Sequence, residues 1–214
     1  KQKSLSSETE NTILLNKSPL RVYEAQTGLI GPPGDNKKFP NHTSIFEVDQ
    51  SNKKKKEVVL VSISNGLKLK KIYKLNNKGF DVEVIHEITN LSKKPINLGV
   101  YLQLLRDDGE PEGGSNFYST YTGPVFYSEK DKFQKVSFSE IKESKAEHTK
   151  ISNDGWLGII QHYYVTAWLI NNSAPREFYS RNLNNNLFSI GAIQTFDDLN
   201  PGSTKIHKST LYVG

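Results

Sequence analysis

The sequence has no cysteine and no methionine, and only four arginines and two tryptophans among its 214 residues. Without cysteine the chain can form no disulfide, no thiol nucleophile and no zinc–thiolate site, which fits an oxidising and a reducing compartment equally well. The chain begins with lysine, and its first twelve residues are hydrophilic and carry no signal-peptide core. We therefore expect a further segment to precede Lys1 in the natural protein.

Long hydrophobic runs are also scarce. The most apolar stretch is "GWLGIIQHYYVTAWL", residues 155–169. Its 15 residues fall short of the roughly 20 that a membrane-spanning helix needs, and Gln161 and His162 stand at its centre. Its β-branched and aromatic composition favours one or two buried strands, although a core helix also fits its spacing.

The net charge is +5, and lysine supplies most of the basic side. Arginine is the residue best suited to bind phosphates and bases through paired hydrogen bonds. The sequence has it only at positions 21, 106, 176 and 181. The longest basic run, residues 53–56, has no aromatic neighbours on which bases could stack. It indicates a solvated hairpin tip, so we exclude nucleic acid as the main partner. With 10 Tyr and 10 Phe the chain is also too rich in apolar anchors to be disordered.

Alternation with a period of two dominates the middle of the chain. Residues 67–75, 80–88 and 96–104 each place apolar side chains on one face, as half-buried strands do. Residues 57–64 are apolar on both faces, which predicts a central strand. Short turns separate these runs and favour an antiparallel meander from 57 to 105. Residues 137–148 predict a short polar helix, or a strand followed by a loop.

These patterns predict an all-β sandwich, mostly antiparallel, with few short helices. We expect residues 1–214 to form one domain, with residues 1–11 loop-like.

The histidines offer little metal or catalytic chemistry. His42, His86, His148, His162 and His207 share no metal-ligand spacing. His86 lies on an apolar strand face, which favours a core histidine over a catalytic one. His162, among Gln161, Tyr163 and Tyr164, is the better candidate for a general base, although it still needs an orienting partner.

One acidic loop, "RDDGEPEGG" at 106–114, gathers Asp107, Asp108, Glu110 and Glu112. It lacks the order of an EF-hand and its closing glutamate, so we interpret it as a solvated loop in preference to a calcium site. Nucleophile-elbow, Walker and dinucleotide fingerprints do not occur in the sequence. We assign no catalytic, cofactor-binding or metal residues and expect no cofactor.

Four collinear pieces resemble the periplasmic domain of the YidC/Oxa1 family of membrane-protein insertases. They are "RVYEAQTGLIG" (21–31), "GGSNFYSTYTGPVFYSEKDKFQKVSF" (113–138), "GWLGIIQHYYVTAWL" (155–169) and "NPGSTKIHKSTLYVG" (200–214). The Gly-Trp start, the Gln-x-Tyr-Tyr centre and the Thr-Ala-Trp end of the third piece are the most specific. The likeness runs from about Thr12 to the C-terminus.

The resemblance implies a β-supersandwich similar to galactose mutarotase, with 155–169 as a core strand region. We interpret Trp156 and Trp168 in it as packing residues. It also implies a non-enzymatic domain on the periplasmic face of a bacterial inner membrane. Such a domain would act as a scaffold or interaction module beside the Sec translocon and nascent membrane proteins. Family members carry strands before "NTILL" and a helical segment after "LYVG", with membrane helices beyond this chain. The missing strands would leave an exposed edge and favour artificial dimers.

Two alternatives come from the mutarotase-like fold alone. An aldose epimerase would need a Glu and a His in one cleft, and the histidine would have to be His86 or His162. A carbohydrate-binding sandwich would line a cleft with exposed rings such as Tyr118, Tyr121 or Tyr127. Because fold alone does not imply function, we expect neither.

Overall fold

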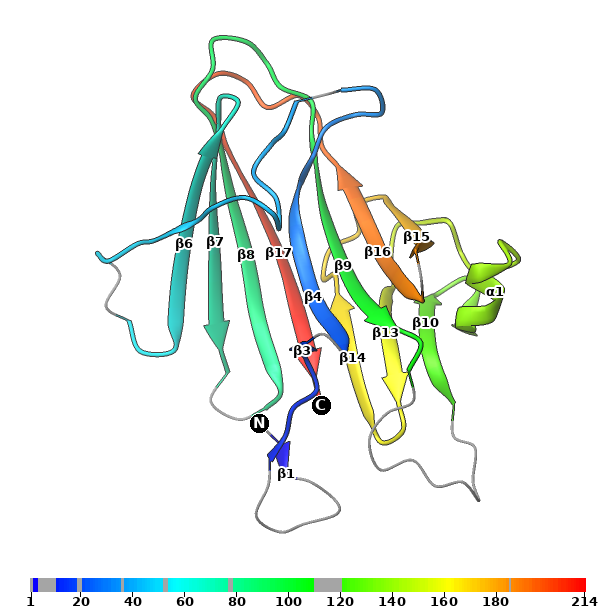
Figure 1. Cartoon of the computed structure of the whole chain (residues 1–214). Coiled ribbons are helices and arrows are strands. Elements are labelled where there is room, and N and C mark those ends of the chain that lie inside the picture. Colours follow the sequence, from blue (N-terminus) through cyan, green and yellow to red (C-terminus); the bar gives the residue numbers. More distant parts are fainter. Residues whose placement is uncertain are drawn as a thin grey trace.

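A computed structural model describes residues 2–3, 11–18, 21–35, 37–51, 54–76, 79–109, 121–184 and 186–214. Within them, two antiparallel sheets pack face to face, and α1 (Phe138–Lys142) lies at one end (Figure 1). A separate two-stranded ribbon pairs β1 (Gln2–Lys3) with β2 (Asn11–Thr12). The residues between these two strands, where a loop was predicted, lie outside the described residues.

The larger sheet has nine strands. In spatial order they are β11 (Lys132–Lys135), β10 (Thr122–Ser128), β13 (Trp156–Gln161), β14 (Tyr164–Leu169), β17 (Thr204–Val213), β8 (Asp81–Asn90), β7 (Leu67–Leu75), β6 (Glu57–Ser64) and β5 (Glu47–Val48).

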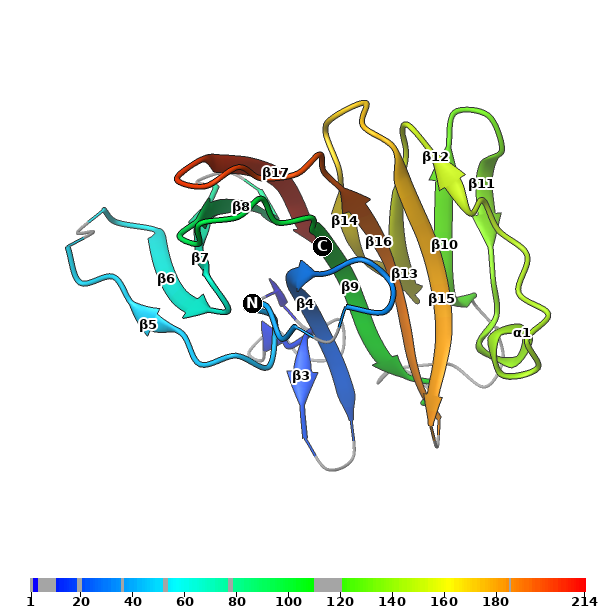
Figure 2. The ribbon, with the colours of Figure 1, turned by 90° about the horizontal axis from the view of Figure 1, so that it is seen from above.

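The smaller sheet has six strands. They follow the order β12 (Ile151–Ser152), β15 (Arg176–Asn184), β16 (Leu187–Thr195), β9 (Gly99–Asp107), β4 (Val22–Ile30) and β3 (Asn16–Lys17). Seen from above, the β5–β8 part of the larger sheet bends away from the β3–β4 edge of the smaller one (Figure 2). One long edge of the smaller sheet therefore faces the inside of a curved partner.

The core lies between the sheets, where the predicted alternation holds. Val100, Leu102 and Leu104 of β9 are each at most 1% exposed, as the period of two in 96–104 predicts. Leu67, Leu69 and Ile88 are fully buried on the facing sheet. Leu75 and Phe80, which the same alternation places inside, are 57% and 52% exposed. Leu75 is the last residue of β7 and Phe80 directly precedes β8, so both stand at the ends of the predicted alternation.

The predicted meander is correct for β6, β7 and β8 and wrong for β9. The edge of β8 that β9 would have used is paired with β17, and β9 instead pairs with β4 and β16 in the second sheet. The prediction that 57–64 is a central strand is also wrong. Among the described strands only the two-residue β5 lies beyond β6, and Ile63 is 63% exposed.

The apolar stretch 155–169 forms two strands, as predicted. β13 and β14 pair in a hairpin whose turn contains His162, at a φ of 55°. Trp168 is buried and donates its indole N–H to the carbonyl of Gln103 at 3.0 Å, so its packing role is confirmed. Trp156 is half-buried and stacks on Tyr127.

The helical alternative for 137–148 is confirmed by α1, where Ser137 and Glu140 form a capping box. In the described part of the chain no helix is both long and apolar enough to cross a bilayer.

Candidate functional site

A cleft of about 630 Å³ opens where β4 faces the curved half of the larger sheet. Its walls come from the β3–β4 edge, from the inner side of β6 and β7, and from the loop at 42–46. The lining residues are Lys17, Glu24, Ala25, Gln26, Thr27, His42, Thr43, Phe46, Leu60, Lys71, Tyr73 and Leu105. We take this cleft as the candidate site.

Gly28 of β4 lets the 41–42 loop approach the strand. A Cβ at Gly28 would lie 2.5 Å from Cα of Asn41 and 2.7 Å from the hydroxyl of Tyr101, both too close to be tolerated. The ring of Tyr101, opposite Gly28 on β9, reaches past it, and its hydroxyl accepts the backbone N–H of His42 at 3.2 Å. The same hydroxyl contacts Nδ1 of His42. This glycine therefore positions His42 in the wall of the cleft.

Lys71 lines the cleft and is 4% exposed, the one buried lysine among the described residues. Its Nζ donates to the carbonyl oxygen of Thr27 at 2.6 Å and lies 4.5 Å from the centroid of the Phe46 ring. No described carboxylate forms an ion pair with it. Burial lowers the pKa of Lys71 to about 8, because a desolvated ammonium without a counterion is disfavoured.

Lys71 begins a row of basic side chains across the inner face of the larger sheet. In the strand register, Lys71 of β7 stands opposite His86 of β8, and His86 stands opposite His207 of β17. Burial, with His207 and Lys71 nearby, holds the pKa of His86 well below its usual value. Burial near Arg176 lowers that of His207 to about 4. Both imidazoles are therefore neutral at pH 7.

Hydrogen bonds define the tautomers of this histidine pair. Thr27 donates its hydroxyl to the carbonyl of Tyr101 at 2.8 Å, so it can only accept from Nε2–H of His86 at 2.9 Å. Nε2 of His207 lies 2.7 Å from the amide oxygen of Gln194 and donates to it. Within the described structure, Nδ1 of neither histidine has a hydrogen-bond partner. The second sheet thus fixes the orientation of both rings through a hydroxyl group and an amide oxygen.

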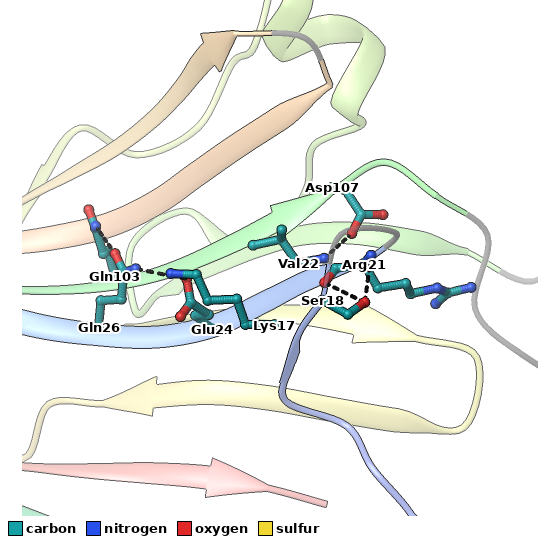
Figure 3. A network of polar contacts seen from close by, with 8 residues as sticks. All are labelled: Lys17, Ser18, Arg21, Val22, Glu24, Gln26, Gln103 and Asp107. Atoms are coloured by element: carbon teal, nitrogen blue, oxygen red, sulfur yellow. Dashed lines mark hydrogen bonds and ion pairs between the residues drawn. The ribbon is translucent and has the colours of Figure 1, made fainter.

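A chain of polar contacts runs from the rim of the cleft over the outer side of β4 (Figure 3). The ammonium of Lys17 forms an ion pair with the carboxylate of Glu24 at 3.3 Å. The same carboxylate accepts a hydrogen bond from Nε2 of Gln26 at 3.2 Å. Gln26 then accepts from Gln103 at 2.7 Å. At the start of β4, Asp107 accepts the backbone N–H of Val22 at 2.7 Å. These contacts occupy both Lys17 and Glu24, the other charged groups of the cleft.

The geometry favours binding over proton transfer. Glu24 and His42 line the same cleft, but Glu24 is held by Lys17 and Gln26, and Nδ1 of His42 by Tyr101. Burial lowers the pKa of His42, Lys71 lowers it further, and Glu24 opposes the shift. The cleft thus offers one buried cation, amides and hydroxyls rather than a prepared acid and base.

His86, His148 and His162 lie at different places in the fold, and none of them lines the cleft. His86 is a fully buried core residue, as its strand face predicts. His162 lies at the β13–β14 turn beside Tyr163 and does not line the cleft. His148 stacks on Phe126, with ring centroids 3.9 Å apart. The cleft residues Lys71 and His42 were missed. For Lys71 a signal existed, because it stands on the inward register of 67–75 between Leu69 and Tyr73.

The remaining candidates do not converge on a site. Asp107 accepts backbone N–H groups of Val22 and Gly109, while Glu110 and Glu112 lie outside the described residues. Throughout the described ranges, no three acidic or histidine side chains gather as metal ligands would. Tyr121 is held by the carbonyls of Pro124 and Val136, and Tyr118 is not described.

Aromatic stacking occurs elsewhere on the larger sheet, but not as a flat platform. Tyr127 and Trp156 are nearly parallel, at 13°, with centroids 6.0 Å apart, and Phe133 is tilted by 48° to Trp156. Tyr127 and Trp156 therefore turn their faces to each other, whereas a sugar-binding platform presents coplanar faces outward.

Sequence comparisons match the whole chain to one family. The family model described as "YidC periplasmic domain" covers residues 1–214. The membrane protein insertase YidC of Janthinobacterium sp. is 37% identical over 98% of this chain and 37% of its own length. That of Bordetella avium is 41% identical over 94% of this chain and 36% of its own length. The chain thus spans well under half of the curated relatives it matches.

Structural comparisons identify the architecture. A galactose mutarotase related enzyme from Lactobacillus acidophilus superposes with a TM-score of 0.55 at 12% identity, covering 81% of this chain and 72% of its own. A galactose mutarotase-like protein from Lactobacillus casei gives 0.51 at 10% identity, covering 90% and 85%. At such identities the likeness shows the fold alone, a galactose mutarotase-like β-sandwich.

Proposed function

The chain belongs to the family of YidC periplasmic domains, and we propose on that premise that it is a non-catalytic interaction module of an inner-membrane protein insertase. The observation that carries the proposal is the family match over residues 1–214. In the proposal this stretch is one domain of a longer protein and lies on the periplasmic face of the membrane. Its partners are the Sec translocon, the accessory subunits of the translocon, and nascent membrane proteins.

The β5–β6 edge is the surface that best supports a protein partner. β5 covers only two residues of β6, so most of the β6 edge is left without a described strand beyond it. Ile45, Val48 and Ile63 are 89%, 57% and 63% exposed at this edge. An open strand edge flanked by apolar side chains is a surface to which a partner strand or loop can add.

Site-specific photocrosslinking in the full-length protein tests this assignment. A photoreactive residue in place of Ile63 is expected to crosslink Sec subunits or a nascent chain in cells. The same probe at Phe133, 46% exposed on β11 at the opposite edge, is the matched control. Equal crosslinking from both positions, or from neither, contradicts a partner surface at β5–β6.

A second test concerns catalysis. Because Glu24 and His42 are each held by other groups, we expect the chain not to accelerate the anomerisation of galactose or glucose, followed by polarimetry. An acceleration that disappears in His42→Ala would show that the cleft is an active site. One that disappears in His162→Ala would place the catalytic base at the β13–β14 turn. Either result overturns the non-catalytic proposal.

A further inference from the structure

Lys71 is a buried charge with unused bonding capacity. An ammonium group has three donors, and the described structure accounts for one of them, the bond to the carbonyl of Thr27. The Phe46 ring lies beside it, and no described carboxylate pairs with it. Yet Lys71 lines a cleft of about 630 Å³. We propose that this cleft binds a ligand bearing one carboxylate group, which pairs with Nζ of Lys71.

The charge of the cleft favours a carboxylate over a phosphate. Lys71 is its one cation without an acidic partner, because Lys17 pairs with Glu24. His86, next to Lys71 in the row, is neutral and bonded to Thr27. A phosphate carries about 1.5 to 2 negative charges and is best held by several donors or by arginine forks. A single point charge matches a single carboxylate.

The arginines do not alter this charge balance. Arg106 and Arg176 are buried elsewhere, on carbonyl groups such as those of Gly109 and Gly155. Neither Arg21 nor Arg181 lines the cleft.

The walls of the cleft indicate what accompanies the carboxylate. The space far exceeds that of a small ion, and Leu60, Leu105, Ala25 and the rings of Phe46 and Tyr73 contribute apolar surface. Gln26, Thr43 and Thr27 add polar groups on the β4 and loop sides. A ligand with an apolar or ring body and one acidic end fits this division. Both a free organic acid and an acidic side chain of a peptide have this chemistry.

Energetics point the same way. Lys71 remains charged at pH 7 although burial disfavours its charge, so its ammonium carries a desolvation cost that no described carboxylate compensates. A carboxylate that pairs with Nζ offsets part of that cost. Binding of the anion and protonation of Lys71 are therefore linked, and each strengthens the other. Bound ligand should raise the pKa of Lys71, a readout that an unrelated surface site would not give.

Titration of the 214-residue chain, followed by NMR, tests the inference with three probes. They are benzoate as a free acid, benzamide as its neutral counterpart, and a capped Gly-Gly-Glu-Gly-Gly peptide as a side-chain acid. We expect saturable shifts around Lys71 with benzoate, the peptide or both, and at least tenfold weaker binding of benzamide. The acid that binds more tightly identifies the source of the carboxylate.

Two variants complete the test. Lys71→Met should weaken carboxylate binding at least tenfold. Lys74→Met, at a half-exposed lysine of the same strand that pairs with Glu83 of β8, should leave it unchanged. A thermal melt of Lys71→Met shows that the variant is folded. Lack of saturable binding by either acid overturns the inference, and so does equal binding to the Lys71→Met protein. The inference does not depend on the Sec assignment, so failure of one leaves the other standing.

Discussion

Replacing Lys71 with Met is expected to raise the free energy of unfolding at pH 7 by up to about 2 kcal/mol. Burial lowers the pKa of Lys71 from 10.5 to about 8. Such a shift corresponds to roughly 3 kcal/mol of disfavoured charge in the folded state. Methionine removes this cost and keeps an unbranched chain in the same space, but it leaves the carbonyl of Thr27 without its donor, at a cost of about 1–3 kcal/mol. The two contributions to the free energy of unfolding leave a net gain of up to about 2 kcal/mol for the variant.

The pH dependence supplies an independent signature of Lys71. Between pH 8 and 10.5 the unfolded chain keeps the Lys71 proton while the folded chain releases it. The unfolded state then binds more protons, so the stability of the native protein rises with pH across this interval. The Lys71→Met protein lacks this rise.

Urea denaturation at pH 7 and pH 9 measures both effects, with Lys74→Met as the control because its Nζ pairs with Glu83 at the surface. A Lys71→Met protein that is less stable than the native one at both pH values would show that the bond to Thr27 outweighs the burial of the charge.

Mild acid is expected to destabilise the sandwich well before its carboxylates titrate. Burial lowers the pKa of His148 and of His207 to about 4 each, and that of His86 well below its usual value. In the unfolded chain these rings bind protons near pH 6.5. Below that pH the unfolded state holds more protons than the native state, so stability falls as pH falls, by up to about 1.4 kcal/mol per pH unit for each ring. Full stability is present above about pH 6.5.

The double variant His86→Gln and His207→Gln isolates the paired rings. The glutamine amide supplies a donor near the position of Nε2, so the bonds to Thr27 and Gln194 have a replacement. It takes up no proton at these pH values. We expect the loss of stability between pH 6.5 and pH 5, measured by urea denaturation at each pH, to be less than half that of the native protein. An unchanged slope would mean that these rings already carry protons in the fold. Stability at pH 8 is the baseline that separates a pH effect from a packing defect.

Several elements could be predicted because their signal is local. Alternation in 67–75, 80–88 and 96–104 identified strands and their inward faces, since successive side chains on a strand point to opposite sides. The polar composition of 137–148 indicated a short helix as one of two alternatives, and α1 confirms it. His86 was assigned to the core from its strand face alone.

The candidate site was not predicted, for reasons visible at its residues. Lys71 stood on the inward register of its strand, yet the alternation was interpreted from the apolar residues of 67–75, and Lys71 was assigned to neither face. His42 belongs to a loop with no periodic pattern, and its place depends on Gly28 and Tyr101, 14 and 59 residues away in sequence. Side chains so distant meet only when β4, β7 and β9 are packed together.

The sequence by itself determined the strands at 67–75, 80–88, 96–104 and 155–169, most of their inward faces and, through four collinear pieces, the family. The tertiary structure alone decided which sheet each strand joins, where β9 leaves the meander and where Lys71 meets Thr27. The physical reason is that alternation specifies which face of a strand is buried and leaves its partner open. Partners are chosen by pairing between distant segments. In this chain that pairing leaves one lysine buried in the cleft between two sheets.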